Sequence, residues 1–207
     1  MRDFLANAMD ALKPRYSELS IFLTAITCVL VAFTYPEFGL LYLDMLFGEE
    51  GARFAGVSLA LGLIATVGFI LSMVHVMTKR KKTELEKTCM GVFAMVANGF
   101  AGILSGIEIL SSQSSILLFF PVWNIAVGTA LLYQIGLNRF EVVDEDATPF
   151  MILGATIILL IVFVVSGLGF RLSWAMRFSI CMFYSSAIVF LIARISSFFH
   201  SQSLAKK

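Results

Sequence analysis

Charged residues are scarce in this chain. Asp, Glu, Lys and Arg make up 14% of its 207 residues, and the mean hydropathy is +0.91. A soluble domain usually carries about 25% charged residues. The apolar residues also lie in runs of about twenty, the length that crosses a bilayer, which excludes a water-soluble globule. We therefore predict one membrane domain, and a net charge of +1 gives no reason to expect a nucleic-acid partner.

The sequence patterns that membrane enzymes and redox proteins need are also missing. The chain has two histidines, His75 and His200, and neither belongs to an HExxH motif. It contains no G-x-S-x-G sequence and no pair of acidic residues within one apolar run. The three cysteines lie in separate apolar runs without CxxC spacing, as packing residues do. We expect no enzymatic activity, no bound metal and no cofactor.

A cluster of basic residues between two apolar runs orients the chain. Residues 78–87, with the sequence TKRKKTELEK, hold five of the 15 Lys and Arg residues. Lys and Arg near the ends of membrane spans stay on the cytoplasmic side, so this loop is predicted to be cytoplasmic. Thr83 and Glu86 have the spacing of a capping box, so the next helix is expected to begin inside the loop.

The hydrophobic pattern predicts an all-α integral membrane protein, a bundle of about six transmembrane helices. The predicted spans are residues 19–35, 54–77, 88–110, 116–137, 149–169 and 173–195. With both termini cytoplasmic, this topology leaves only three of the Lys and Arg residues on the outer side, namely Arg53, Arg171 and Arg177. A re-entrant run at 116–137 would give five crossings and a weaker charge asymmetry, and this alternative stays open. Residues 149–169 are the most uniformly apolar run and the best candidate for lipid contact.

Three shorter segments complete the expected organisation. Residues 3–12 predict an amphipathic helix within a cytoplasmic N-terminal region, residues 1–18. Pro36 should end the first span, and residues 38–47 are too short to cross, which predicts an interfacial or re-entrant segment on the outer side. The transmembrane domain then covers residues 19–195. Residues 196–207 are expected to form a polar, mobile cytoplasmic tail.

Small residues recur at helical spacing in two spans, which favours close helix packing. Gly68 and Ser72 do so in the second span, and a stripe with a four-residue repeat follows in the third. An amide in hydrocarbon needs a partner, which the stripe can bring near. Glu108 is a candidate for binding a cation or proton, or for reaching the outer headgroups. The candidate helix-packing or pore residues are Ala94, Asn98, Gly102, Gly106, Glu108, Asn124 and Gln134.

Two oppositely charged patches face the cytoplasm in this topology. The basic patch consists of Lys79, Arg80, Lys81, Lys82 and Lys87, and the acidic patch of Glu141, Asp144, Glu145 and Asp146. Anionic lipid headgroups are the simpler partner for the basic patch, but they would repel the acidic patch. We expect the acidic patch to bind a cytosolic protein or a neighbouring basic loop.

These features favour a non-enzymatic multi-pass subunit that forms homo-oligomers through small-residue helix faces and anchors, or senses for, a cytosolic partner. A small oligomeric channel or transporter is the alternative, because amides and glycines can line water without fixed charge. Size and layout resemble, by analogy alone, small multi-pass proteins of bacterial antiviral defence or toxin-immunity systems. The expected location is the bacterial inner membrane, with the lipid bilayer as the first partner.

Overall fold

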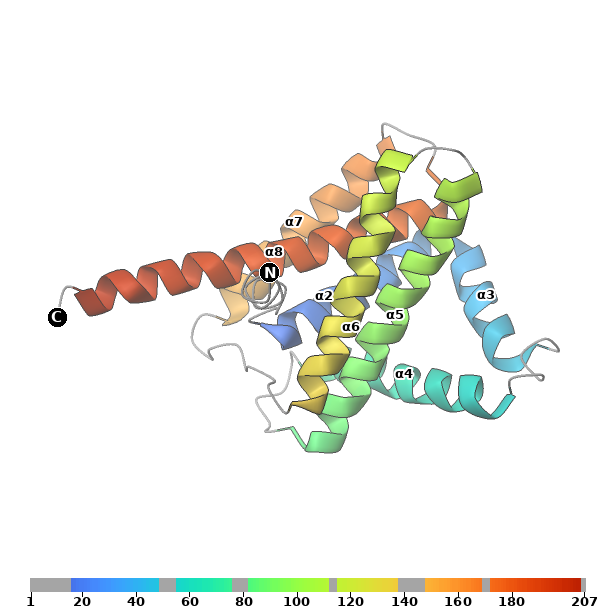
Figure 1. Ribbon diagram of the computed structural model, residues 1–207, viewed down its shortest axis with the longest axis horizontal. Helices are drawn as coiled ribbons and strands as arrows, with labels where there is room; N and C mark the ends of the chain where they lie inside the picture. The colour runs from blue at the N-terminus through green and yellow to red at the C-terminus, as the bar shows by residue number, and fades with distance from the viewer. Residues whose placement is uncertain are drawn as a thin grey trace, which may run out of the picture.

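The computed structural model describes residues 16–48, 55–75, 82–111, 115–137, 148–168 and 172–205 (Figure 1). This part of the chain is almost entirely helical and contains no strand. The elements, in chain order, are α2 (Ser17–Thr34), α3 (Pro36–Phe47), α4 (Ala55–His75), α5 (Glu84–Ser111), the short 3-10 helix η2 (Ser115–Leu118), α6 (Phe119–Gly136), α7 (Thr148–Leu168) and α8 (Trp174–Ala205).

Five of these helices are long and apolar enough to cross a membrane, namely α2, α5, α6 with η2, α7 and α8. In α4 the corresponding apolar stretch is shorter and covers Leu59–Val74. Helices satisfy their own backbone hydrogen bonds, which is what a hydrocarbon environment requires of a spanning segment. The all-helical class is confirmed, and five apolar helices of this length fit the predicted multi-pass membrane protein.

The first spanning helix, α2, lies at the centre of the bundle. Twelve of its 18 residues are buried, and it contacts α3, α4, α5, α7 and α8. Its polar side chains are buried with the apolar ones, and Thr27 Oγ1 donates a hydrogen bond to the carbonyl oxygen of Leu23 at 2.9 Å. Hydroxyls are costly to leave unpaired in hydrocarbon. A helix that carries several of them is therefore more stable among other helices of the protein than in lipid.

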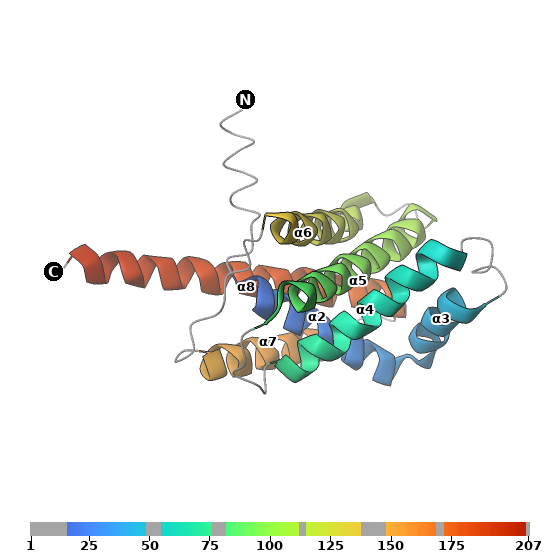
Figure 2. The ribbon, with the colours of Figure 1, turned by 90° about the horizontal axis from the view of Figure 1, so that it is seen from below.

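Helices α5 and α6 form an antiparallel pair that crosses α8 steeply (Figures 1 and 2). The contact runs from Gly91 beside Ile135 to Gly102 beside Pro121. A Cβ atom added at Gly102 would lie 2.8 Å from the carbonyl oxygen of Pro121, which is too close for any real side chain. Glycine is therefore required where the two backbones approach, as the sequence pattern predicts.

Helix α4 approaches α5 even more closely at Gly68. A Cβ atom there would lie 2.0 Å from the carbonyl oxygen of Cys89. One turn later Ser72 is buried and donates its hydroxyl to the carbonyl oxygen of Gly68 at 2.6 Å. The rings of Phe69 and Phe93 pack edge to face beside this point. Gly68 of the second predicted span thus faces α5.

The segment after α2 folds back on the bundle as the short helix α3. Pro36 is its first residue and ends α2, as predicted. Phe38 packs edge to face against Phe178 and Trp174 of α8, with ring centroids 5.0 and 5.5 Å apart. Tyr42 lies within 2.8 Å of the hydroxyl of Thr66 on α4. The predicted short segment is therefore a helix that begins two residues earlier than expected.

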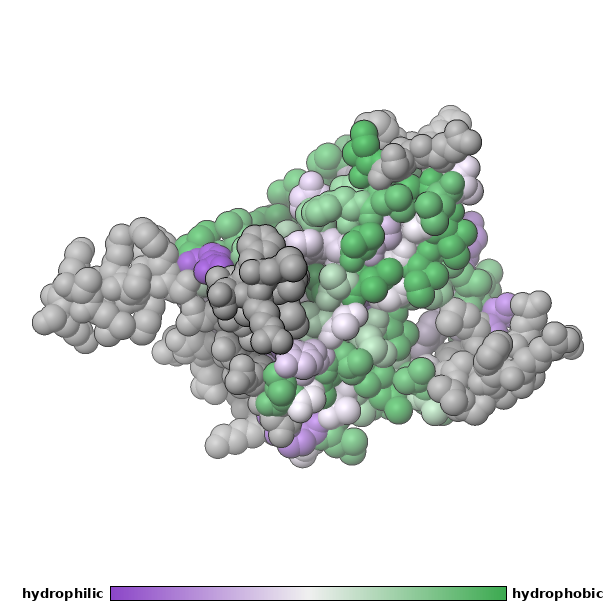
Figure 3. All heavy atoms as spheres, in the orientation of Figure 1, coloured by the Kyte–Doolittle hydropathy of each residue, from purple (hydrophilic) through white to green (hydrophobic). Residues whose placement is uncertain are grey.

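The outer surface of the bundle is apolar. Figure 3 shows one face, on which hydrophobic residues predominate among the described residues. On α7, the side chains of Leu153, Ile157, Ile161 and Val165 are exposed. This helix was predicted to make the most lipid contact, and it is the span with the smallest buried share.

Two boundaries differ from the sequence-based expectation. The tail was predicted to be mobile from residue 196, but α8 continues to Ala205. No Gly or Pro follows Leu172, so nothing in the sequence ends the helix earlier. The predicted amphipathic helix at residues 3–12 lies outside the described residues. Ser17 and Glu18, assigned to the N-terminal region, belong to α2.

Candidate functional site

Polar contacts gather at the two ends of α2, and we call them the N-end cluster and the C-end cluster. In the N-end cluster, three consecutive residues bind three different parts of the chain. The hydroxyl of Tyr16 donates to Ser196 Oγ on α8 at 2.9 Å. Ser17 Oγ donates to Gln134 Oε1 on α6 at 2.5 Å. Glu18 forms an ion pair with Lys82, which stands just before α5.

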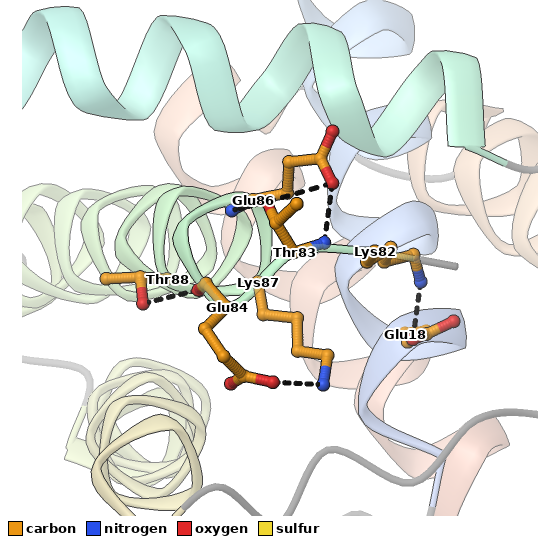
Figure 4. A network of polar contacts seen from close by, with 7 residues as sticks. All are labelled: Glu18, Lys82, Thr83, Glu84, Glu86, Lys87 and Thr88. Carbon is orange, nitrogen blue, oxygen red and sulfur yellow. Dashed lines mark hydrogen bonds and ion pairs between the residues drawn. The ribbon is translucent and has the colours of Figure 1, made fainter. Parts of the chain in front are cut away.

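The Glu18–Lys82 ion pair is buried. The side chain of Lys82 is 7% exposed and that of Glu18 is 9% exposed, and Figure 4 shows the ammonium group directed at the carboxylate. Burial lowers the pKa of Lys82, while the hydrogen bond and charge of Glu18 act in the opposite direction. Removing two charges from water is costly. Such a pair therefore contributes more to the alignment of α2 with the start of α5 than to the free energy of unfolding.

A capping box positions Lys82. The backbone N–H of Thr83 donates to Glu86 Oε2 at 2.7 Å, and the N–H of Glu86 donates to Thr83 Oγ1 at 3.3 Å. These reciprocal bonds start α5 at Glu84, which confirms the predicted motif. Glu84 and Lys87 form a separate, more exposed pair at 2.8 Å (Figure 4). Lys82 is therefore anchored by both its backbone neighbours and its own side chain.

The C-end cluster joins the ends of α2 and α5 to the start of α8. The hydroxyl of Tyr35 donates to the carbonyl oxygen of Leu172 at 3.3 Å. Ser173 Oγ donates to Glu108 Oε2 at 2.5 Å. The candidate carboxylate at the end of the third span is thus bound to the residue that precedes α8.

Arg177 is the buried cation of the C-end cluster. Its side chain donates from Nε and Nη2 to the carbonyl oxygen of Phe163 on α7, at 3.1 and 2.6 Å. The guanidinium carbon lies 3.8 Å from the centre of the Phe163 ring and 5.9 Å from that of Tyr35. A cation near the C-terminal end of α7 also meets the negative end of that helix dipole. Arg177 therefore ties α7 and α2 to α8.

The stripe on α5 faces α6 of the same chain. The side chain of Asn98 is buried and lies beside Gly128, where an added Cβ would be 3.1 Å from the Asn98 Cβ. Its amide nitrogen donates to the carbonyl oxygen of Ala94 at 2.8 Å, within its own helix. Gly106 lies beside Pro121. The four stripe residues lie on one surface of α5: Ala94, Asn98, Gly102 and Gly106. Helix α6 covers Gly102 and Gly106.

The other two amides, both on α6, form hydrogen bonds to helices other than α5. Asn124 is fully buried and donates to the backbone oxygen and the hydroxyl of Ser179 on α8, at 2.9 and 2.8 Å. Gln134 belongs to the N-end cluster. Asn98, Glu108, Asn124 and Gln134 are therefore distributed among several contacts rather than gathered around one centre.

The charged patches are described only in part. Lys82 and Lys87 are the basic-patch residues within the described ranges, and they bind Glu18 and Glu84 respectively. Lys79, Arg80, Lys81 and the entire acidic patch lie outside these ranges. Among the residues with a described position, no group of three His, Cys, Asp or Glu side chains is placed to hold a metal ion.

Sequence reasoning missed most residues of these clusters, among them Tyr16, Ser17, Glu18 and the bridging role of Arg177. One available signal was the recurrence of Ser17, Ser20, Thr24 and Thr27 at helical spacing, which marks a polar seam that needs protein contacts. A carboxylate at the start of a span, Glu18, was the other.

No protein-family model, curated protein sequence or solved structure matches the chain.

Proposed function

We propose that the chain crosses the membrane six times, with both termini in the cytoplasm. The N-end cluster contains the starts of α2 and α5, Gln134 near the end of α6, and Ser196 of α8. The C-end cluster contains the ends of α2 and α5 and the start of α8. The chain therefore passes between the two clusters from residue 35 to residue 82, and α4 supplies the sixth crossing. The basic residues Lys82 and Lys87 favour a cytoplasmic location for the N-end cluster.

Cysteine labelling tests this topology. With Cys28, Cys89 and Cys181 replaced by alanine, Asp144→Cys should be labelled by a membrane-impermeant maleimide only after the cells are permeabilised. Glu37→Cys, on the exposed side of α3, should be labelled on intact cells and serves as the opposite control. Labelling of position 144 from outside would contradict six crossings. It would favour the alternative of five crossings, in which residues 116–137 are re-entrant.

We further propose that the protein is a non-enzymatic subunit of a homo-oligomer that binds a cytosolic protein. One observation carries this proposal: α8 continues past Ser196, its contact with the N-end cluster, to Ala205. In the proposed topology the ends of α4 and α6, the starts of α5 and α7, and the extension of α8 are all cytoplasmic, and the sequence carries the two charged patches between these helix ends. A helix and two loops of opposite charge offer a soluble protein a specific surface.

The channel alternative has less support. A pore along the α5 stripe would need the stripe to face other copies or a water-filled space, but Gly102 and Gly106 lie against α6 of the same chain. Asn98 is 2% exposed. The bacterial inner membrane and a defence or immunity role belong to the proposal through the analogy of layout alone.

The mass of the complex in nanodiscs, with identification of the bound proteins, tests the subunit proposal. We expect a homo-oligomer with one soluble protein, and at least about a tenfold loss of that protein when Asp144, Glu145 and Asp146 are replaced by lysine. Glu37→Lys, which reverses a charge on the opposite side, should leave binding unchanged. A symmetric oligomer without a bound protein would favour the channel. Equal binding by the charge-reversed chain would remove the acidic patch from the interface.

A further inference from the structure

The last helix is longer than its own bundle can cover. α8 has 32 residues, which at about 1.5 Å per residue gives about 48 Å, against about 30 Å of hydrocarbon. Its contact with the N-end cluster is at Ser196, and Figures 1 and 2 both show the helix continuing away from the other elements. A lone helical segment of nine or ten residues is marginal in water without a packing partner. The extension therefore calls for one.

One side of α8 is also exposed within the span. Tyr184 is 40% exposed, Leu191 59% and Ile195 48%, and Ala187 between them is half-buried. These residues follow one another by three, four and four positions, so they lie along one side of the helix and we call them the α8 seam. The spacing matches the face by which two helices wind around each other, and the small Ala187 permits a close approach.

Tyr184 indicates that protein, rather than lipid, covers the α8 seam. It lies near the middle of the span Trp174–Ser196, where acyl chains offer no hydrogen-bond partner. Tyrosine is instead enriched at membrane interfaces, where its hydroxyl reaches water or headgroups.

The three half-buried tyrosines of the described chain each have a partner for their hydroxyl, whereas the exposed Tyr133, near the end of α6, has none among the described residues. Tyr16 donates to Ser196, Tyr35 to Leu172, and Tyr42 contacts Thr66. The hydroxyl of Tyr184 has no hydrogen bond to any described residue, although its ring packs against Phe183. A phenol left unpaired in hydrocarbon is costly, and because Tyr184 lies near mid-span, a partner from another molecule would stabilise it.

We propose that the α8 seam is the interface with a second copy of this chain, packed parallel about a two-fold axis that passes near Tyr184. A phenol is both donor and acceptor, so two Tyr184 hydroxyls related by such an axis satisfy each other. Parallel packing follows because both copies share one membrane topology, and it also places the two extensions side by side outside the bilayer. This interface rests on the proposed homo-oligomer and replaces the α5 stripe, which α6 covers.

Cross-linking in native membranes tests the interface. In the background without native cysteines, Leu191→Cys and Ile195→Cys should give covalent dimers with a short bismaleimide. Leu153→Cys and Ile161→Cys, equally exposed on α7, are the matched controls and should stay monomeric on denaturing gels. An intact oligomer cross-linked through α7 alone would overturn the α8 interface and leave the subunit proposal standing. A monomer in nanodiscs would overturn both.

Removal of the single hydroxyl tests the hydrogen bond. Tyr184→Phe keeps the ring, and we expect it to raise the dissociation constant of the dimer about threefold to tenfold, the usual range for one hydrogen bond between membrane helices. Tyr133→Phe, at an exposed tyrosine on α6, should leave the constant unchanged. Equal constants for Tyr184→Phe and the unmodified chain would exclude Tyr184 from the interface. The phenylalanine variant preserves the fold, so its secondary structure should match that of the unmodified chain.

Discussion

Replacing Gly68 by alanine is expected to destabilise the bundle by about 2 kcal/mol or more, because overpacking a well-filled contact typically costs about 1–3 kcal/mol. The added Cβ would lie 2.0 Å from the carbonyl oxygen of Cys89 and 2.6 Å from its carbonyl carbon. Both atoms belong to the backbone of α5, so no side-chain rotation can relieve the clash. The two helices must separate, and each loses contacts along its length.

The free energy of unfolding in mixed detergent micelles measures this effect. Gly99→Ala and Gly154→Ala are matched controls, because an added Cβ at either position meets no atom within 4 Å. Both should be neutral or slightly stabilising, since alanine favours the helix over glycine by about 1 kcal/mol at most. If Gly68→Ala unfolds no more readily than Gly99→Ala, α4 and α5 do not approach each other closely at Gly68 in the folded protein.

Breaking the Glu18–Lys82 ion pair from one side is expected to have a still larger effect. Lys82→Met removes the ammonium group that pairs with the buried carboxylate of Glu18, and loss of one partner of a buried pair typically costs about 3–5 kcal/mol. Replacing both residues, as Glu18→Leu with Lys82→Met, removes the buried charge altogether. The double variant should therefore recover most of the lost stability.

The same unfolding measurement compares the single and double variants in a double-mutant cycle. Glu84→Gln is the control, because the Glu84–Lys87 pair is exposed and should contribute about 0.5 kcal/mol or less. Strictly additive losses at positions 18 and 82 would mean that the two side chains do not interact in the membrane.

Local signals in the sequence placed most helix boundaries correctly. Pro36 cannot donate a backbone hydrogen bond, and it separates α2 from α3 as expected. Thr83 and Glu86 satisfy each other's backbone N–H groups, so the start of α5 was readable from two residues. The end of α8 was missed because a change in polarity was taken as the end of a helix, although the backbone meets no breaker there.

Which helix faces which could not be read in the same way. Hydropathy describes one segment at a time, so the central place of α2 was invisible even though α2 was recognised as a span. The stripe from Ala94 to Gly106 predicted close packing, but small residues do not encode whether the partner is α6 or another copy. Glu18 and Lys82 are separated by 64 positions, and only the packing of α2 against α5 brings them together.

The central position of α2 has a consequence for how the chain is made. It is the first of the apolar helices long enough to cross a membrane in the described chain. Yet α2 and the adjacent Tyr16 bind Lys82, Gln134 and Ser196, and the last of these is synthesised 180 residues after Tyr16. Until those segments arrive, these three contacts are missing from the start of α2. During biogenesis α2 should therefore stay beside the translocon, or be shielded by an insertion chaperone, and a chain truncated before α8 should be removed by membrane proteases.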